Sequence, residues 1–308
     1  MSGGAPDAPR YTGVRTFASL PQATAPDGLS AAVLGVPFDT ATSYRAGARF
    51  GPEAIRSASA LLRTHDMALG VDALGGAADC GDVVITPGNA ARTMEQIAAG
   101  LEPFAAAGVT TMTLGGDHSI SLGELRAHAA AHGAPLALVL LDAHADVWDA
   151  YYGEKIFHGT PFRRAVEEGL LAPERSLMAG MRGPLYDPAD LEAARDLGFE
   201  VLIGDDLRAL DPTAYAARVL ARVGDSPAFL SFDVDVVDPA FAPGTGTPEV
   251  GGLTSVEALG FLRALAGMRF VGFDVVEVSP PYDGPGQVTA LLAANVAYTM
   301  LGLAARAR

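Results

Sequence analysis

The stretch PLALVLLDAHAD, residues 135–146, decides how this chain folds. The run PLALVLL carries no charge, and a strand that is apolar throughout is typical of a parallel sheet covered by helices on both faces. Polar residues follow at once, because Asp142, His144 and Asp146 alternate with alanines. Ligands bind beyond the carboxyl ends of such strands, so this stretch predicts both a core strand and the edge of the sheet that carries a site.

The same succession of an apolar run, a loop and an Ala-rich helical segment repeats along the chain from Ala31. Such alternation predicts an α/β fold with a central, mostly parallel sheet between two layers of helices. Strands are predicted for AAVLGV from Ala31, VTTMTLG from Val109, PLALVLL from Pro135, SLMAGM from Ser176, EVLI from Glu200, AFLSFDVD from Ala228 and RFVGFDVV from Arg269. Helices are predicted near residues 52–63, 90–107, 120–132, 160–170, 188–197, 212–223, 255–266 and 287–304.

The alternation of strands and helices runs without a break that would mark a domain boundary. No linker rich in Ser or Pro, no charge block and no internal repeat occurs. Residues 1–308 are therefore predicted to form a single three-layer α/β/α domain, a size that such folds reach as one unit. Residues 1–25 fall outside the pattern and are predicted to be a peripheral N-terminal arm, either a loose tail or a contact with a neighbouring subunit.

The composition narrows the classes of partner. The formal net charge of −15 argues against nucleic acid, because basic residues are needed to neutralise phosphates. The single cysteine, Cys80, excludes an intrachain disulfide and a Cys-based zinc site and is typical of a reducing compartment. No signal segment and no run of about 18 apolar residues is apparent. The chain is therefore expected in the cytoplasm, with no nucleic-acid or membrane partner.

Polar side chains directly follow three of the predicted strands. A lone Asp in such a place is more often a turn former or a helix cap, and a lone His is more often a hydrogen-bonded core residue. Four Asp and two His with no basic partner nearby in the sequence favour another interpretation, because buried carboxylates need a counter-charge. The candidate metal ligands are His118, Asp142, His144, Asp146, Asp233 and Asp235.

The ligand types narrow the choice of metal. Carboxylates and imidazoles without a thiolate suit Mn²⁺, and Ni²⁺, Zn²⁺ and Fe²⁺ accept the same donors. So many carboxylates favour two ions over one, because paired ions share carboxylates and acidify a water between them. The predicted cofactor is a pair of Mn²⁺ ions.

Three segments together resemble the signature motifs of the ureohydrolases, the arginase and agmatinase family. They are GGDHS at 115–119, DAHAD at 142–146 and SFDVDVVDPAFAPGTGTPEVGG at 231–252. The resemblance runs from Val33 to the end of the last predicted helix. It implies an arginase-like fold and the metal-assisted hydrolysis of a guanidinium group to urea and an amine. It also implies a homo-oligomer, either a trimer or a hexamer.

The resemblance distributes the candidate ligands between two ions. The implied ligands of one ion are His118, Asp142, Asp146 and Asp233, and those of the other are Asp142, His144, Asp233 and Asp235. Asp142 and Asp233 would then bridge the ions, in agreement with their places at the start of their motifs. Asp238 is not carried over as a ligand.

Four residues are implied to act on the substrate. Glu277, in DVVEVSP, resembles the family glutamate that binds the guanidinium, a planar cation suited to a carboxylate. Thr247 resembles the threonine that supports this contact. His158, in FHGTPFRR, resembles the histidine that passes a proton to the departing amine, and Asp146 is implied to help hold the reaction intermediate. Helix capping for Glu277 and a structural role for His158 remain alternatives.

The identity of the substrate stays open. The surroundings of His158 and the run SYRAGARFGPEAIR at 43–56 resemble agmatinases, guanidinobutyrases and proclavaminate amidinohydrolase more than arginases. Agmatine is the first expectation, and guanidino acids such as 4-guanidinobutyrate, a guanidino-tailed secondary metabolite and free guanidine are the alternatives. Arg45 and Arg49 follow the first strand, where either would pair with a substrate carboxylate or hold the loop. Candidate residues of the pocket mouth are Trp148, Asp149, Tyr151, Tyr152 and Phe157.

Two other classes of protein remain as alternatives. A metal-dependent deacetylase on the same fold would use one Zn²⁺, and the presence of His144 and Glu277 argues against it. A catalytically inactive regulatory subunit is the other alternative, and the complete set of ligand positions argues against that.

Overall fold

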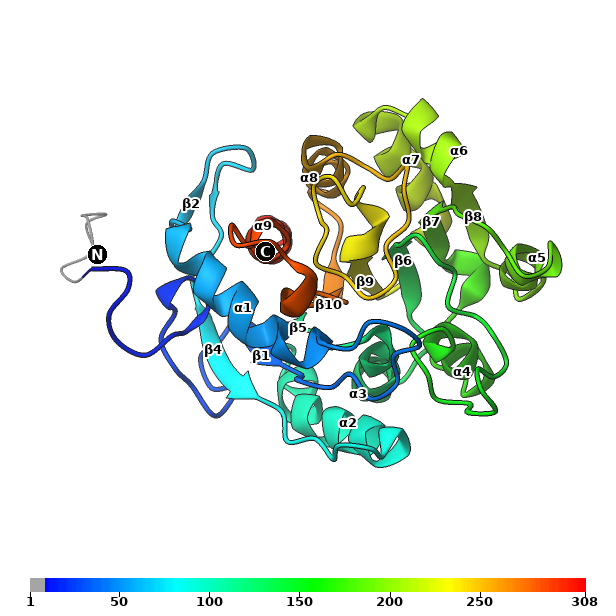
Figure 1. The fold of residues 1–308 in the computed structure, drawn as a ribbon. Helices are drawn as coiled ribbons and strands as arrows, with labels where there is room; N and C mark the ends of the chain where they lie inside the picture. Colours follow the sequence, from blue (N-terminus) through cyan, green and yellow to red (C-terminus); the bar gives the residue numbers. More distant parts are fainter. Residues whose placement is uncertain (1–8) are drawn as a thin grey trace.

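A sheet of eight strands runs through the middle of the computed structural model, which describes residues 9–308 (Figure 1). The strand order is β4-β1-β5-β10-β9-β6-β7-β8, and every recorded pairing in this sheet is parallel. The strands are β1 (Ala31–Gly35), β4 (Ala77–Asp82), β5 (Thr110–Leu114), β6 (Ala137–Leu141), β7 (Leu177–Met181), β8 (Glu200–Ile203), β9 (Ala228–Asp233) and β10 (Phe270–Val276). The predicted α/β class is confirmed, and β4 is a strand that the sequence did not predict.

Helices cover both faces of the sheet. On one face lie α2, α3 and α4, and on the other lie α1, α9, α8 and α7 (Figure 1). The helices are α1 (Gly51–Ala58), α2 (Ala90–Ala106), α3 (Ser121–His132), α4 (Pro161–Glu167), α5 (Ala189–Asp196), α6 (Gly204–Ala209), α7 (Pro212–Val223), α8 (Ser255–Ala264) and α9 (Val288–Arg306). All the predicted helices are present, whereas α6 and a small hairpin of β2 (His65–Asp66) and β3 (Val71–Asp72) were not predicted.

Alternate residues of the central strands face the two helical layers. Val33 and Val139 lie in the core beneath α8 and α9, whereas Leu34 and Leu138 lie in the core beneath α2 and α3. All four side chains are almost fully buried. Because successive side chains of a strand point to opposite faces, a strand between two helical layers must be apolar throughout, which explains the uninterrupted apolar runs.

Helix α9 qualifies the expectation that no segment is apolar enough for a membrane span. Its mean hydropathy is 1.6 over an 18-residue window, which satisfies the length and composition of a span. However, 78% of that window is buried inside the structure. A helix that is apolar all round and enclosed by its own domain is a core helix, and α9 packs against α1, α8 and β10 in that role.

The predicted N-terminal arm is only partly described, since residues 1–8 lie outside the described residues. Phe17 is fully buried, and its backbone N–H donates to Asp79 Oδ2 at 2.7 Å. The N–H of Ala23 donates to the carbonyl oxygen of Asp79 at 3.1 Å. The second half of the arm therefore packs against strand β4 of its own chain.

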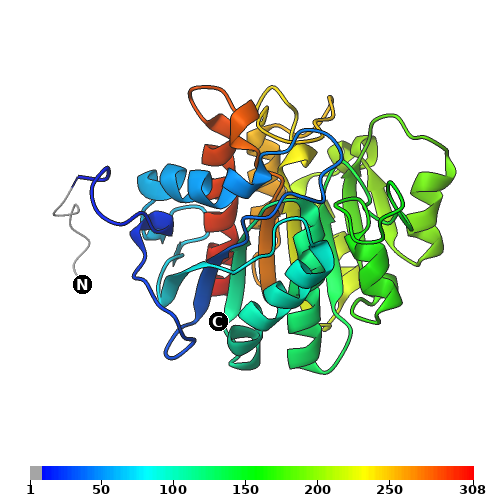
Figure 2. The ribbon, with the colours of Figure 1, turned by 60° about the horizontal axis from the view of Figure 1, so that its bottom comes forward.

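The sheet order brings distant parts of the sequence to one place. Strands β5, β10, β9 and β6 are neighbours at the centre of the sheet, although the segments 115–136, 142–227 and 234–269 separate them in the sequence. The loops that follow β9 and β10 gather at the upper edge in Figure 2. Because the strands are parallel, the loops after β5 and β6 leave from the same edge, where ligand sites of such sheets form.

Candidate active site

The loops that carry the candidate ligands begin with tight turns. Asp142 Oδ1 accepts from the His144 N–H at 2.6 Å, and Asp233 Oδ1 accepts from the Asp235 N–H at 2.8 Å. Such turns hold the first carboxylate at the strand end while the chain changes direction. Asp146 has a positive φ of 51°, which is a strained backbone conformation for a residue other than glycine. Residues with such strained backbones cluster at active sites and ligand sites.

The first group of candidate ligand atoms surrounds the imidazole of His118. Its Nδ1 lies 3.0 Å from Asp142 Oδ2, 3.0 Å from Asp146 Oδ2 and 3.3 Å from Asp233 Oδ2. Neither Nδ1 nor Asp142 Oδ2 has a well-formed hydrogen bond to any residue of 9–308, although both are fully buried. One nitrogen facing three carboxylate oxygens is the arrangement expected of ligands around a shared cation.

The second group shares one residue with the first. His144 Nδ1 lies 3.0 Å from Asp235 Oδ2 and 3.6 Å from Asp142 Oδ1. Asp142 therefore turns one oxygen toward His118 and the other toward His144, as a residue between two ions would. The structure thus brings all six predicted metal ligands together in two adjoining groups.

A second layer of polar contacts orients the His118 ring. Its Nε2 lies 2.9 Å from Ser231 Oγ. A hydrogen bond donated by Nε2 leaves Nδ1 without a proton and with its lone pair toward the carboxylates, and partners of this kind commonly fix metal-binding histidines. Nearby, Asp274 Oδ2 accepts from Ser121 Oγ at 2.6 Å, so the polar layer continues behind the ligands.

Burial and neighbouring groups shift the pKa values of the ligand carboxyls in opposite directions. Burial raises the pKa of Asp233 well above its ordinary value, and the charges of Asp235 and Asp142 raise it further. Burial also opposes ionisation of Asp142, but its contacts with His118 and His144 outweigh burial and lower the pKa of that carboxyl. No Lys or Arg of residues 9–308 forms a salt bridge with these carboxylates. Buried oxygen and imidazole donors without such a partner fit divalent cations.

Glu277 lies next to the ligand groups and has one free oxygen. Oε1 accepts from the His118 N–H at 3.0 Å and lies 3.0 Å from His158 Nδ1. Oε2 is buried and has no hydrogen-bond partner within the described chain. The backbone of Glu277 is strained, with φ at 63°. The structure therefore holds a carboxylate in a fixed orientation with one oxygen available to a cation.

The two other predicted substrate-binding residues have different surroundings. His158 contacts Glu277 and is 12% exposed, and the pKa of its ring is raised because the hydrogen bond and charge of Glu277 outweigh the opposing effect of burial. Thr247, which was expected to support Glu277, has its hydroxyl 3.4 Å from Asp235 Oδ2. Gly246, the residue before Thr247, lies beside Glu277, since a Cβ added to Gly246 would lie 3.3 Å from Oε2.

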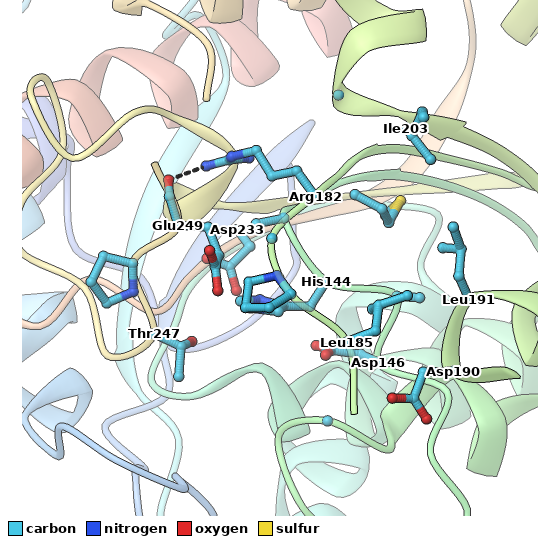
Figure 3. Close-up of a pocket in the computed structure, with 18 of the residues that line it drawn as sticks. His144, Asp146, Arg182, Leu185, Asp190, Leu191, Ile203, Asp233, Thr247 and Glu249 are labelled. Atoms are coloured by element: carbon cyan, nitrogen blue, oxygen red, sulfur yellow. Dashed lines mark hydrogen bonds between the residues drawn. The ribbon is translucent and has the colours of Figure 1, made fainter. Parts of the chain in front are cut away.

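A cavity of about 910 Å³ opens over these residues. In Figure 3, Asp233, His144 and Asp146 lie between Thr247 on one side and Asp190 on the other. Trp148 and Tyr151 form an aromatic wall, with stacked rings whose centroids are 4.7 Å apart. The cavity is large enough for a substrate with a tail beyond its reacting group.

The side chains of the loop after Asp146 lie in different places, some in the cavity wall and others in the core or at the surface. Only Trp148 and Tyr151 of its five predicted mouth residues line the cavity. Asp149 bonds instead to Arg164 at 2.9 Å. Of the other two, Phe157 is buried in the core and Tyr152 is 76% exposed to solvent.

The two arginines after β1 also separate. Arg49 Nε donates to Asp39 Oδ1 at 2.6 Å, and Asp39 also accepts from the Gly47 N–H at 2.8 Å. Arg49 therefore holds the loop. Arg45 lines the cavity, and its guanidinium lies 5.4 Å from the ring centre of Tyr44 and 5.2 Å from that of Tyr282.

Comparison with known proteins agrees with this geometry. The profile of the arginase family matches residues 29–302. The chain is 45% identical to guanidinobutyrase from Pseudomonas aeruginosa over 97% of this chain and 94% of that protein. The chain belongs to the arginase family.

Other members of the arginase family match over similar lengths. Mitochondrial agmatinase from Gallus gallus is 44% identical over 95% of this chain and 86% of that protein. The solved structure of proclavaminate amidino hydrolase from Streptomyces clavuligerus has a TM-score of 0.92 and 41% identity, covering 98% of this chain and all of that one. The predicted family and its arginase-like fold are therefore confirmed.

Proposed function

We propose that this chain is a binuclear, manganese-dependent hydrolase that converts a guanidino compound into urea and an amine. One observation carries the proposal: two groups of His and Asp ligand atoms share Asp142 beside a Glu277 oxygen that has no partner among residues 9–308. The ligand groups need inorganic cations, and a free carboxylate oxygen suits a guanidinium. Relatives named guanidinobutyrase and agmatinase support the same class of reaction.

Each proposed role fits the contacts of its residue. Glu277 would bind the guanidinium through Oε2, because Oε1 is held by two hydrogen bonds. His158 lies next to that carboxylate and would pass a proton to the departing amine nitrogen. Asp146, in the loop after β6, would help to hold the reaction intermediate. Thr247 lines the cavity and bonds to Asp235, so it would act close to the bound guanidinium.

The proposed metal follows from the donor atoms. The ions would be held by the two groups around His118 and His144, with Asp142 and Asp233 between them. When bound, two divalent cations supply Lewis-acid activation of a water molecule near neutral pH. Mn²⁺ is proposed because the site is rich in carboxylates and lacks a thiolate, and Ni²⁺, Zn²⁺ and Fe²⁺ are the alternatives.

The proposed substrate is an ω-guanidino acid such as 4-guanidinobutyrate, rather than the agmatine that the sequence favoured. Arg45 supports this choice because it lines the cavity and forms no salt bridge with any described residue. Its neighbour Arg49 is already bound to Asp39. A guanidinium that pairs with no carboxylate of residues 9–308 is suited to planar recognition of a substrate carboxylate. Agmatine remains the second candidate because Asp190 and Glu249 also line the cavity.

Urea release from a panel of guanidino compounds tests both levels of the proposal. The panel contains 4-guanidinobutyrate, 3-guanidinopropionate, agmatine and guanidine, with Mn²⁺ or Ni²⁺ supplied. We expect 4-guanidinobutyrate to be at least ~10-fold better in kcat/KM than agmatine, because a hydrogen bond to a charged group contributes about 1.5–3 kcal/mol. No urea from any compound with metal bound would overturn the reaction class, and a preference for agmatine would overturn the substrate.

The variant Arg45→Ala sharpens the test of the substrate. We expect a selective loss on the acid with little change for agmatine. An equal loss on both compounds would mean that Arg45 is part of the scaffold.

We also propose a homo-oligomer, a trimer or hexamer, located in the cytoplasm. Exposed Tyr44, Val250 and Val256 support association, since each leaves more than two thirds of its surface open to solvent. The single half-buried Cys80 supports a reducing compartment, because the chain has no other cysteine to pair with it. Light scattering at micromolar concentration tests the assembly, and a monomer would contradict it.

A further inference from the structure

His158 is held at both ring nitrogens, and its contact at Nε2 has no role in the reaction as proposed above. Nδ1 lies 3.0 Å from Glu277 Oε1, whereas Nε2 lies 2.8 Å from Ser43 Oγ and 3.0 Å from Ser43 N. The backbones are joined as well, because the His158 N–H donates to the carbonyl oxygen of Ala41 at 3.0 Å. These contacts leave the ring little freedom to turn.

The backbone contact determines which ring nitrogen carries the proton. A backbone N–H only donates, so Nε2 must direct its lone pair toward Ser43. In a neutral imidazole the other nitrogen then carries the hydrogen. His158 is therefore in the Nδ1–H form and donates to Glu277 Oε1, on the side where a guanidinium would bind.

The hydroxyl of Ser43 adds what the backbone N–H cannot supply. A hydroxyl both donates and accepts, so Oγ can give a proton to Nε2 and can accept a hydrogen bond from Nε2–H afterwards. Ser43 is half-buried and lines the same cavity as His158, which gives Oγ access to water in the cavity. Ser43 thus connects the outer nitrogen of His158 with that water.

We infer that Ser43 is the positioning residue of His158, which selects its Nδ1–H form and exchanges protons with the cavity through Oγ. This inference rests on the proposed function. As the Nδ1 proton passes to the departing amine nitrogen, the proton of Oγ moves to Nε2, and a cavity water replaces the Oγ proton and is left as hydroxide. In the other half of the cycle the attacking water releases a proton to Nδ1, while the Nε2 proton returns through Oγ to that hydroxide and restores a neutral water. The ring remains neutral in both states.

The variant Ser43→Ala isolates the hydroxyl, because it keeps the backbone N–H. We expect kcat to fall about tenfold, the usual effect of losing one hydrogen bond of ~1.4 kcal/mol, with KM changed less than twofold. Ser43→Thr keeps a hydroxyl and should restore kcat. Thr40→Ala is the matched control, since the Thr40 hydroxyl lies in the same loop and accepts from the Gly88 N–H outside the site. An unchanged kcat in Ser43→Ala would overturn the inference.

A double-mutant cycle separates positioning from general damage to the loop. In a His158→Asn background, Ser43→Ala should have no further effect on urea release. The same tenfold loss in that background would mean that Ser43 acts without His158, which would overturn the inference.

A measurement without substrate keeps the inference separate from the proposed reaction. Nitrogen-15 chemical shifts of the histidine rings report which nitrogen is protonated, and the His158 signals are assigned by their loss in His158→Asn. We expect protonated Nδ1 and unprotonated Nε2 in the parent protein and also in Ser43→Ala, because that variant keeps the backbone N–H that donates to Nε2. An Nε2–H form in the parent would overturn the inference, whereas a parent that releases no urea would overturn the proposed function alone.

Discussion

Two groups of carboxylates, each with a buried member, differ in the source of the positive charge that balances them. At strand β4, Arg56 Nε lies 2.8 Å from Asp79 Oδ2, and Arg56 Nη1 lies 2.6 Å from Asp82 Oδ1. At the ends of β6 and β9, histidines are the only side chains of residues 9–308 that form ion pairs with Asp142 and Asp233. The first group therefore contains an arginine as its cation, whereas the second has no Lys or Arg partner among residues 9–308 and is the site proposed above for metal ions.

The difference separates a structural site from a chemical one. Burial opposes the charge of Arg56, but its bonds with Asp79 raise the pKa of the guanidinium, so the group stays ionised. Asp79 also accepts from the Phe17 N–H, so the pair joins α1, β4 and the N-terminal segment. Glu277 is intermediate between the two cases, since Oε1 accepts a hydrogen bond from the chain and Oε2 has no hydrogen-bond partner among residues 9–308.

Removing the carboxylate shared by both ligand groups should have the largest effect. We expect Asp142→Asn to lower urea release by at least ~10³-fold, because changes even one shell further from a metal cost about 10–100-fold. Metal content, measured by mass spectrometry of the dialysed protein, should fall as well. Asp233→Asn should behave in the same way.

The stability of Asp233→Asn distinguishes a ligand from a structural acid. Without metal, this variant should melt no lower than the metal-free parent, because burial and the charges of Asp235 and Asp142 raise the pKa of the Asp233 carboxyl and so disfavour its ionised form in the folded state. Full activity at unchanged metal stoichiometry would refute the binuclear site.

Arg56→Met tests the opposite case. We expect the free energy of unfolding to fall by about 3–5 kcal/mol, because removing one partner leaves buried Asp79 without compensation. Denaturant titration measures this loss, and the activity per folded molecule should remain near that of the parent. Asp82→Asn is the control with a smaller expected loss, since the Asp82 side chain is 47% exposed. Equal losses in both variants would mean that burial does not decide the strength of this cluster.

Glu277→Gln tests the intermediate case. Arg56 makes a bidentate contact with Asp79, with one hydrogen bond to each carboxylate oxygen. In Glu277, Oε2 is the oxygen without a hydrogen-bond partner among residues 9–308, so a bound guanidinium would contact that oxygen alone. Removing its charge should lower kcat/KM by about 10²-fold, the upper end of a hydrogen bond to a charged group. Both metals should stay bound, which mass spectrometry checks. A variant that loses metal would show that Glu277 supports the ligands instead.

The strands and ligands could be predicted because their signals are local. Apolar runs marked seven strands, and polar residues directly after them marked the six ligands. Strand β4, with the sequence AADCGD, lacked this signal because it is the last strand on its side of the sheet, beyond β1, and an edge strand need not be apolar throughout. Its Asp79 pairs with a residue 23 positions away, a spacing with no periodic pattern.

Contacts between loops could not be predicted. Ser43 meets His158 across 115 residues, and no motif in either loop indicates the pairing. In the same way, the sequence offered Arg45 and Arg49 equally, and only the position of Asp39 in the folded loop distinguishes them. Such contacts depend on how two irregular segments pack, so they become visible only in three dimensions.

Glu124 is a buried acid of a third kind, because it forms no ion pair with an arginine of residues 9–308 and is not a candidate metal ligand. Glu124 on α3 is fully buried, and neither carboxylate oxygen has a hydrogen-bond partner among residues 9–308. Burial raises its pKa well above 4.5, and the charge of Asp274 raises it further. We therefore expect the Glu124 carboxyl to be neutral in the folded protein. The free energy of unfolding should fall as the pH rises into the range where a carboxyl in the unfolded chain is ionised.

The variant Glu124→Leu should consequently stabilise the protein in a pH-dependent way. A carboxyl whose pKa is raised by folding binds its proton more tightly in the native state, so its cost is absent below the unfolded value of 4.5 and grows as the pH rises above it. We expect the variant to exceed the parent by ~1 kcal/mol or more in unfolding free energy at pH 8, with the gap narrowing toward pH 4.5. Urea titrations of the metal-free proteins measure this, and Glu102→Leu, at an exposed position on α2, should give a gap that does not vary with pH. A loss of stability in Glu124→Leu at every pH would mean that a contact of Glu124 stabilises the fold. Buried acids that pair with neither an arginine nor a metal would then not be a separate class.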